Sequence, residues 1–181
     1  MARIKIIDIT HATGKTKELL TAVQSSLKII PNLAKALANS SVALETWINL
    51  NGVLGKGSLD AKTREAIALA VAQKNGCEYC LSAHTVIGKL AGLSEKQILD
   101  SREGQGSSAK ITAALQFARE LVDSRGKVPG SSVEALRASG VTDGEIAEII
   151  AHVALNIFTN YFNTALDIDV DFPRVALHQV A

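Results

Sequence analysis

Apolar side chains recur every three or four residues along most of the 181-residue chain. The segment from Ile111 to Val122 is typical, because its apolar positions follow the i, i+3, i+4, i+7 series of one helix face. Strand-type alternation is limited to residues 3–9, which form either a short strand or an extended arm. The sequence therefore predicts an all-α fold.

Capping residues, glycines and prolines divide this pattern into separate helices. Asp60 can cap a helix that runs to about Lys74, and Asn75-Gly76 then ends it. Two capping-box patterns begin helices further along the chain, Ser94 with Gln97 and Thr142 with Glu145. The expected helices cover residues 18–30, a short stretch from 31, and residues 42–54, 60–74, 77–91, 94–101, 111–122, 133–138 and 142–166.

Charge and apolar content limit the possible functions. The chain carries 19 Lys and Arg against 18 Asp and Glu, for a formal net charge of +1. This balance argues against a nucleic-acid or anionic-membrane partner, because both favour clustered positive charge. No apolar run approaches the ~18 to 20 residues that span a bilayer, and no signal-type stretch follows the first residues. We therefore expect a cytoplasmic protein.

The length fits a single domain over residues 1–181. Within it we expect an N-terminal arm and helix over residues 1–40, a core over 41–170 and a tail over 171–181. The last long helix is apolar on most of its circumference, so we expect it near the core.

The chain holds two cysteines, Cys77 and Cys80, only three positions apart. Such a pair cannot link distant parts of a fold, which excludes a disulfide framework and leaves redox chemistry, metal binding or chance. At ~100° per residue, Cys77, Cys80 and His84 fall within about 60° of one another on one helix face. The three side chains are therefore expected to point the same way.

The Asn75-Gly76 stop places both cysteines in the first turn of a helix, where free N–H groups and the helix dipole favour a thiolate. His84 follows Cys80 by one turn and is its natural proton acceptor. We therefore assign Cys80 as the attacking sulfur and Cys77 as the resolving one, which closes a disulfide. A chain reversal at the stop would bring Glu65 level with His84, where a carboxylate can orient the imidazole.

These residues also have a purely structural interpretation. The two cysteines can be small buried side chains, and Glu65 can be a solvated partner of Lys62 or Arg64. Glu78 and Tyr79 lie between the cysteines, and we expect them to be packing and surface residues and not participants in the chemistry.

A stripe of polar side chains, spread over about 80°, interrupts the apolar surface of the last helix. Its members are His152, Asn156, Asn160 and Asn163. We expect them to make buried hydrogen bonds at a helix or subunit interface, with a contribution to the thiol site as the alternative.

A weak internal repeat relates this helix to the cysteine segment. The shift that places Glu65 on Glu148 also places Cys77-x-x-Cys80 on Asn160-x-x-Asn163. A duplicated helical unit with one competent copy and a chance similarity both explain this pattern.

Glu65, eleven intervening residues, Cys77-x-x-Cys80, three more residues and His84 together resemble the signature of the AhpD-like alkylhydroperoxidases. These proteins belong to the wider carboxymuconolactone decarboxylase superfamily. The resemblance extends from about Leu59 to Asn163, and the segment from Asn156 to Asn163 is similar to segments of the peroxidase-related branch.

The resemblance implies an all-helical AhpD-like bundle with a central antiparallel hairpin, assembled into homo-oligomers such as trimers or hexamers. It implies that Cys80 attacks a hydroperoxide, Cys77 resolves, His84 is the base and Glu65 completes the proton relay. No cofactor is implied beyond the Cys77–Cys80 disulfide, which a protein or lipoyl-type dithiol would reduce. One departure stands out, because the best-known members have a His where this chain has Tyr79.

The leading hypothesis is therefore a thiol-dependent peroxidase for organic or hydrogen peroxide. One alternative is a general dithiol–disulfide oxidoreductase. Another is a metal-binding regulator, with Cys77, Cys80 and His84 as zinc ligands and Glu65 or His152 as the fourth. Family members that decarboxylate a lactone lack the cysteines, so that activity is disfavoured.

Overall fold

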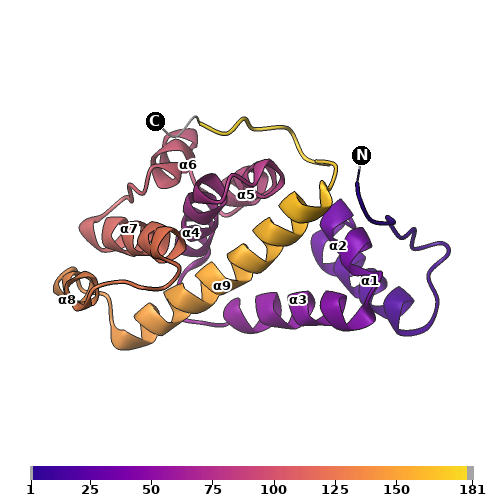
Figure 1. Ribbon diagram of the computed structural model, residues 1–181, viewed down its shortest axis with the longest axis horizontal. Coiled ribbons are helices and arrows are strands. Elements are labelled where there is room, and N and C mark those ends of the chain that lie inside the picture. Colours follow the sequence, from indigo (N-terminus) through magenta and orange to yellow (C-terminus); the bar gives the residue numbers. More distant parts are fainter. Residues whose placement is uncertain (1, 179–181) are drawn as a thin grey trace.

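The computed structural model describes residues 2–178, and all regular structure in this range is α-helical (Figure 1). This confirms the all-α prediction. The nine helices of the described range are α1 (Gly14–Leu27), α2 (Asn32–Leu37), α3 (Ser41–Leu54), α4 (Ala61–Lys74), α5 (Glu78–Leu90), α6 (Glu95–Arg102), α7 (Ala109–Ser124), α8 (Gly130–Ala138) and α9 (Asp143–Leu166).

Helix α4 is the centre of the fold and packs against α5, α6, α7 and α9. Its Leu69 belongs to an apolar cluster shared with α1, α2 and α5, whereas Ile67 and Val71 belong to a second cluster with α7 and α9. All three side chains are fully buried. One helix therefore forms a wall of both apolar clusters.

The chain reverses between α4 and α5, as the sequence predicts. Asp60 caps the start of α4 by accepting a hydrogen bond from the Thr63 N–H at 2.8 Å. At the other end, Gly76 adopts a left-handed φ of +65°, and the Cys77 N–H then donates to the Ala72 carbonyl at 3.0 Å. This turn places the first residues of α5 beside the last turn of α4.

Helix α9 is the longest helix and crosses the molecule diagonally in Figure 1, in contact with α3, α4, α5 and α7. Both capping boxes predicted from the sequence are present, at the starts of α6 and α9. The four polar residues of the α9 stripe are all buried, which confirms that this helix lies near the core.

The internal repeat does not extend to the turn. The shift that aligns Glu65 with Glu148 places the Asn75-Gly76 reversal on residues 158–159. Those residues lie inside the continuous helix α9, so the second segment is straight where the first is a hairpin. The two segments therefore have different local structures despite their similar residues.

The N-terminal segment is an extended arm and not a strand. It is held by the Arg3 N–H, which donates to the Leu166 carbonyl at 2.7 Å, and by the Ile7 N–H, which donates to the Lys35 carbonyl at 3.1 Å. Helix α1 begins four residues before the predicted start, because its first residues are Gly14-Lys-Thr-Lys17 and show no apolar periodicity. It also ends earlier than predicted, at a left-handed Lys28.

The C-terminal segment that follows α9 is drawn in yellow in Figure 1, and its described part lies along α5. The Val175 N–H donates to Ser82 Oγ at 3.0 Å, and Arg174 forms an ion pair with Glu78 at 2.9 Å. The buried Arg102 guanidinium donates to the Ala176 carbonyl at 2.8 Å. The predicted tail spans 171–181, of which 179–181 lie outside the described residues.

Within residues 2–178, no helix is both long enough and apolar enough to cross a membrane.

Candidate active site

A disulfide joins Cys77 and Cys80 at the start of α5. Cys77 occupies the N-cap position, and its Sγ accepts a hydrogen bond from the Cys80 N–H at 3.2 Å. Both side chains are buried, with exposures of 1% and 3%. The two sulfurs therefore lie at a helix N-terminus, where unpaired N–H groups stabilise negative charge on sulfur once the bond is reduced.

One turn further along α5, His84 meets Glu65 of α4. The distance between His84 Nδ1 and Glu65 Oε2 is 2.7 Å, and both side chains are mostly buried. The structural alternative for Glu65 was an ion pair with a neighbouring cation, but the Arg64 guanidinium donates instead to the Leu59 carbonyl at 2.6 Å. The hairpin thus brings together two residues that are 19 positions apart.

This contact has a direct chemical consequence. When Nδ1 of His84 carries the ring proton and donates a hydrogen bond to the Glu65 carboxylate, Nε2 is the nitrogen that can accept a proton. The negative charge of Glu65 also stabilises the imidazolium that forms when Nε2 takes up a proton. The pair can therefore act as a general base and later as a general acid.

Asn163 of α9 also contacts this disulfide. Its Nδ2 donates a hydrogen bond to Cys80 Sγ at 3.2 Å, and both groups are buried. Asn163 belongs to the polar stripe of α9, for which a contribution to the thiol site is the alternative role predicted from the sequence. The contact supports that alternative for this one residue.

Comparison with known proteins places this arrangement in a family context. Residues 42–123 match the carboxymuconolactone decarboxylase family. The matched segment contains Glu65, Cys77, Cys80 and His84. The resemblance inferred from the motif is confirmed by this match together with the relatives that follow.

The chain is similar in sequence to the alkyl hydroperoxide reductase AhpD of Mycobacteroides abscessus, with 30% identity over 70 residues. The match covers 39% of this chain and 40% of the relative, so the chain spans less than half of that protein's length.

Solved structures share the fold over most of the chain. A peroxidase-related protein with an alkylhydroperoxidase AhpD core, from Ralstonia eutropha JMP134, superposes with a TM-score of 0.84 and 21% identity, covering 94% of this chain and 92% of its own. A second peroxidase-related protein, from Silicibacter sp. TM1040, superposes with a TM-score of 0.78 and 23% identity, covering 99% of this chain and 98% of its own. The debrominase Bmp8 superposes with a TM-score of 0.75 and 20% identity, covering 87% of this chain and 86% of its own. At these identities the likeness shows the fold, which is the AhpD-like bundle expected from the sequence.

The hydrogen bonds of the remaining stripe residues go to groups other than the sulfurs in the described structure. Asn160 Oδ1 accepts a hydrogen bond from Asn75 Nδ2 at 2.9 Å, which ties the α4–α5 turn to α9. Asn156 Nδ2 donates to the His152 carbonyl one turn before it at 2.8 Å. Burial lowers the pKa of His152, and the nearby positive Arg64 lowers it further. Asn160 thus fits the predicted role in buried hydrogen bonding between helical segments, whereas Asn156 bonds within α9 and His152 Nε2 is buried without a partner among residues 2–178.

Tyr79, which replaces the family histidine, connects the hairpin to the tail. Its hydroxyl donates to Asp171 Oδ1 at 2.8 Å and accepts from the Leu33 N–H at 3.1 Å. The ring packs edge-on against Phe172, with ring centres 5.7 Å apart. Burial raises the pKa of the Tyr79 hydroxyl above its usual range, so the group stays neutral. These contacts anchor the tail and pack the hairpin against it.

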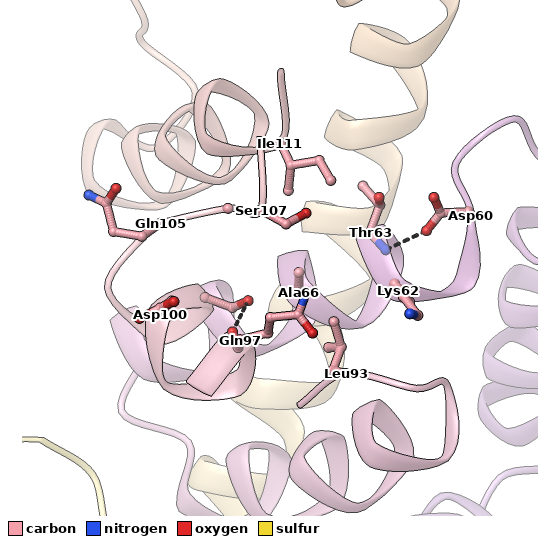
Figure 2. Close-up of a pocket in the computed structure, with 12 residues that line it drawn as sticks. Asp60, Lys62, Thr63, Ala66, Leu93, Gln97, Asp100, Gln105, Ser107 and Ile111 are labelled. Carbon is pink, nitrogen blue, oxygen red and sulfur yellow. Dashed lines mark hydrogen bonds between the residues drawn. The ribbon is translucent and has the colours of Figure 1, made fainter. Parts of the chain in front are cut away.

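The pocket in Figure 2 lies apart from this chemistry. Its twelve lining residues come from α4, α6, the start of α7 and the loops beside them, and include Asp60, Lys62, Gln97 and Asp100. Neither cysteine, nor His84, nor Glu65 is among them. Across residues 2–178, no group of three or more His, Cys, Asp or Glu side chains is placed so that it could hold a metal ion.

Proposed function

We propose that this protein is a thiol-dependent peroxidase of the alkylhydroperoxidase type. The observation that carries the proposal is the juxtaposition of the Cys77–Cys80 disulfide with the His84–Glu65 pair, one turn further along α5. A redox pair beside a carboxylate-oriented imidazole has the parts that nucleophilic sulfur chemistry requires.

The proposed cycle begins with the reduced pair. The Cys80 thiolate attacks one peroxide oxygen, the O–O bond breaks, and an S–O bond forms, so that sulfur is oxidised to sulfenic acid while the peroxide is reduced. The departing alkoxide takes a proton from the His84 imidazolium, which Glu65 stabilises. Cys77 then attacks the Cys80 sulfur, the disulfide closes, and water leaves. The sum is one dithiol and one hydroperoxide giving one disulfide, one alcohol and one water.

The burial of the sulfurs favours small reactants. With Cys77 and Cys80 almost inaccessible, a hydroperoxide fits the site better than the surface disulfide of a folded protein. The same reasoning favours a slender, lipoyl-type dithiol as the reductant. The alkyl hydroperoxide reductase of Mycobacteroides abscessus supports this reaction class, because its amino-acid sequence is 30% identical to this chain over 70 residues.

Thiol counting tests this proposal directly. The chain has no cysteines besides Cys77 and Cys80, so the count reports on this pair alone. One equivalent of hydroperoxide should remove both thiols from the reduced protein and appear as one equivalent of alcohol. Cys80→Ser should abolish peroxide consumption, whereas Ser139→Ala, at the partly exposed C-cap of α8, should not change it. Full activity in Cys80→Ser would refute the assignment.

A second candidate is a general dithiol–disulfide oxidoreductase. It is favoured by the position of Cys77, whose sulfur caps α5 and accepts the Cys80 N–H, an arrangement that stabilises a Cys77 thiolate. The two candidates differ in the substrate that reacts faster with the same reduced sample. Rapid exchange with small disulfides and negligible reaction with hydroperoxides would favour the oxidoreductase.

We also propose that the protein assembles into a homo-oligomer. Large apolar side chains stand exposed on α3 and α9, with Val42 at 72%, Val53 at 67%, Tyr161 at 59% and Ile150 at 45% exposure. Burial of such side chains between subunits would stabilise a trimer or hexamer. Light scattering on the eluting protein measures the mass directly, and a monomer at micromolar concentration would refute the proposal.

A further inference from the structure

Asn163 presents both ends of its amide inside the protein, next to the sulfur assigned as the nucleophile. The Nδ2 end donates to Cys80 Sγ at 3.2 Å. The Oδ1 end is buried and has no hydrogen-bond partner within residues 2–178. A buried amide oxygen without a partner is costly, which makes it a group that needs an explanation.

We propose that Asn163 is a catalytic residue that stabilises two successive states of Cys80, the thiolate and the sulfenic acid. The inference rests on the proposed function for its second part, because a sulfenic acid forms only if Cys80 attacks a peroxide. The first part concerns the reduced thiol alone and stands on the hydrogen bond to sulfur.

The first state is the thiolate. A hydrogen bond from a neutral N–H is stronger to a negative sulfur than to a thiol, so the Asn163 donor favours ionisation of Cys80. The Cys80 N–H cannot supply this interaction, because it donates to Cys77 Sγ. Asn163 is therefore the side-chain donor to Cys80 Sγ that the structure shows, and it comes from a different helix than His84.

The second state is the sulfenic acid. Transfer of oxygen from the peroxide leaves an S–O–H group on Cys80, whose hydroxyl is a hydrogen-bond donor. Asn163 Oδ1 is an acceptor with no partner in the described structure, on the same side chain that already touches the sulfur. Accepting this hydrogen bond would hold the sulfenic acid until Cys77 attacks the sulfur and water leaves.

An alkylation experiment tests the thiolate half without any peroxide. In a Cys77→Ser background, the rate of Cys80 alkylation by iodoacetamide is followed against pH. Asn163→Leu, which keeps the approximate size and removes the donor, should raise the midpoint by about one pH unit. The limiting rate at high pH should not fall, because a thiolate of higher pKa is the better nucleophile.

Two further variants separate this effect from general damage. Asn163→Asp places a carboxylate beside the sulfur and should also raise the midpoint, so it tests the proposal if the leucine variant fails to fold. Asn156→Leu is the matched control, because Asn156 is buried on the same helix but its side-chain amide donates to the His152 carbonyl and not to a sulfur. An unchanged midpoint in a folded Asn163 variant, or an equal shift in Asn156→Leu, would overturn the thiolate role.

Trapping the oxidised sulfur tests the second half. After one equivalent of hydroperoxide, Cys77→Ser should form a sulfenic acid that dimedone captures, and adding Asn163→Leu should shorten its lifetime at least severalfold. No captured sulfenic acid in Cys77→Ser would refute the proposed peroxidase while leaving the alkylation result intact. Equal lifetimes with and without Asn163 would overturn the acceptor role and leave the peroxidase standing.

Discussion

Glu65 Oε2 lies 2.7 Å from His84 Nδ1, and this contact joins the two helices of the central hairpin beside the disulfide. The carboxylate comes from α4, whose other faces are buried in the core, so its position is fixed by the packing of the whole domain. His84 lies one turn after Cys80 on α5. The orientation of the base is thus determined by the fold and not by a mobile loop.

Glu65→Gln should slow peroxide consumption about tenfold or more, because the amide still holds the imidazole but no longer stabilises its charged form. The loss should appear in kcat/KM measured with saturating reductant. Glu18→Gln, at an exposed position of α1, is the matched control and should leave the rate unchanged. A Glu65→Gln protein with full activity would exclude this carboxylate from the relay.

Local chemistry explains which parts of the fold could be predicted. Helix starts at Ser94 and Thr142 follow from capping boxes, and the reversal at Gly76 follows from a glycine that tolerates positive φ. The Glu65–His84 contact was predictable because it depends only on that reversal and on helix geometry. Where residues 18–30 were expected as a helix, the true start differs because periodicity says nothing about a polar first turn.

The Asn163–Cys80 contact shows what the sequence could not determine. It joins α9 to α5 across the core, and its geometry depends on how two helices far apart in sequence pack together. Helix phase placed Asn163 on a buried polar stripe but did not say which of the four members would face the sulfur. The docking of the tail on Tyr79 and Ser82 was equally hidden, because the tail is irregular and carries no periodic signal.

Tyr79→Phe should loosen the tail. The change removes the donor to Asp171 and leaves the Leu33 N–H without its acceptor, which should lower the free energy of unfolding by about 1 to 2 kcal/mol. Chemical denaturation measures the loss, and limited proteolysis should cut the tail faster. Tyr161→Phe is the control, because it removes only a hydroxyl from a side chain that is 59% exposed and keeps the apolar ring that a subunit interface would bury. Unchanged stability and unchanged cleavage would show that Tyr79 does not hold the tail.

Asn160→Leu should destabilise the hairpin turn. The Oδ1 of the fully buried Asn160 accepts the Asn75 Nδ2 hydrogen bond, so its replacement removes this bond from a partly buried donor at a cost of about 1 kcal/mol. The same change at the exposed Asn49 on α3 should cost little. Equal unfolding midpoints for the two variants would contradict the role assigned to the Asn160–Asn75 bond.

The last prediction concerns the pH dependence of stability. Burial, followed by the positive charge of Arg64, lowers the pKa of His152 below its ordinary value of 6.5, although Glu148 and Glu65 act in the opposite direction. The unfolded chain therefore takes up a proton at His152 at a higher pH than the native protein does. Stability from this residue is complete above about pH 6.5 and is lost progressively as the pH falls below that value.

His152→Gln should remove this part of the dependence, so that the difference in unfolding free energy between wild type and variant shrinks as the pH is lowered from about 7 to about 5.5. Glu148, whose pKa is lowered from 4.5 mainly by the Ser58 N–H, loses its contribution only at more acidic pH and does not interfere in this window. Denaturant unfolding at a series of pH values measures the effect, with His11→Gln, a change at an exposed histidine, as the control. A constant difference between wild type and His152→Gln across the window would mean that His152 does not titrate differently in the folded and unfolded states.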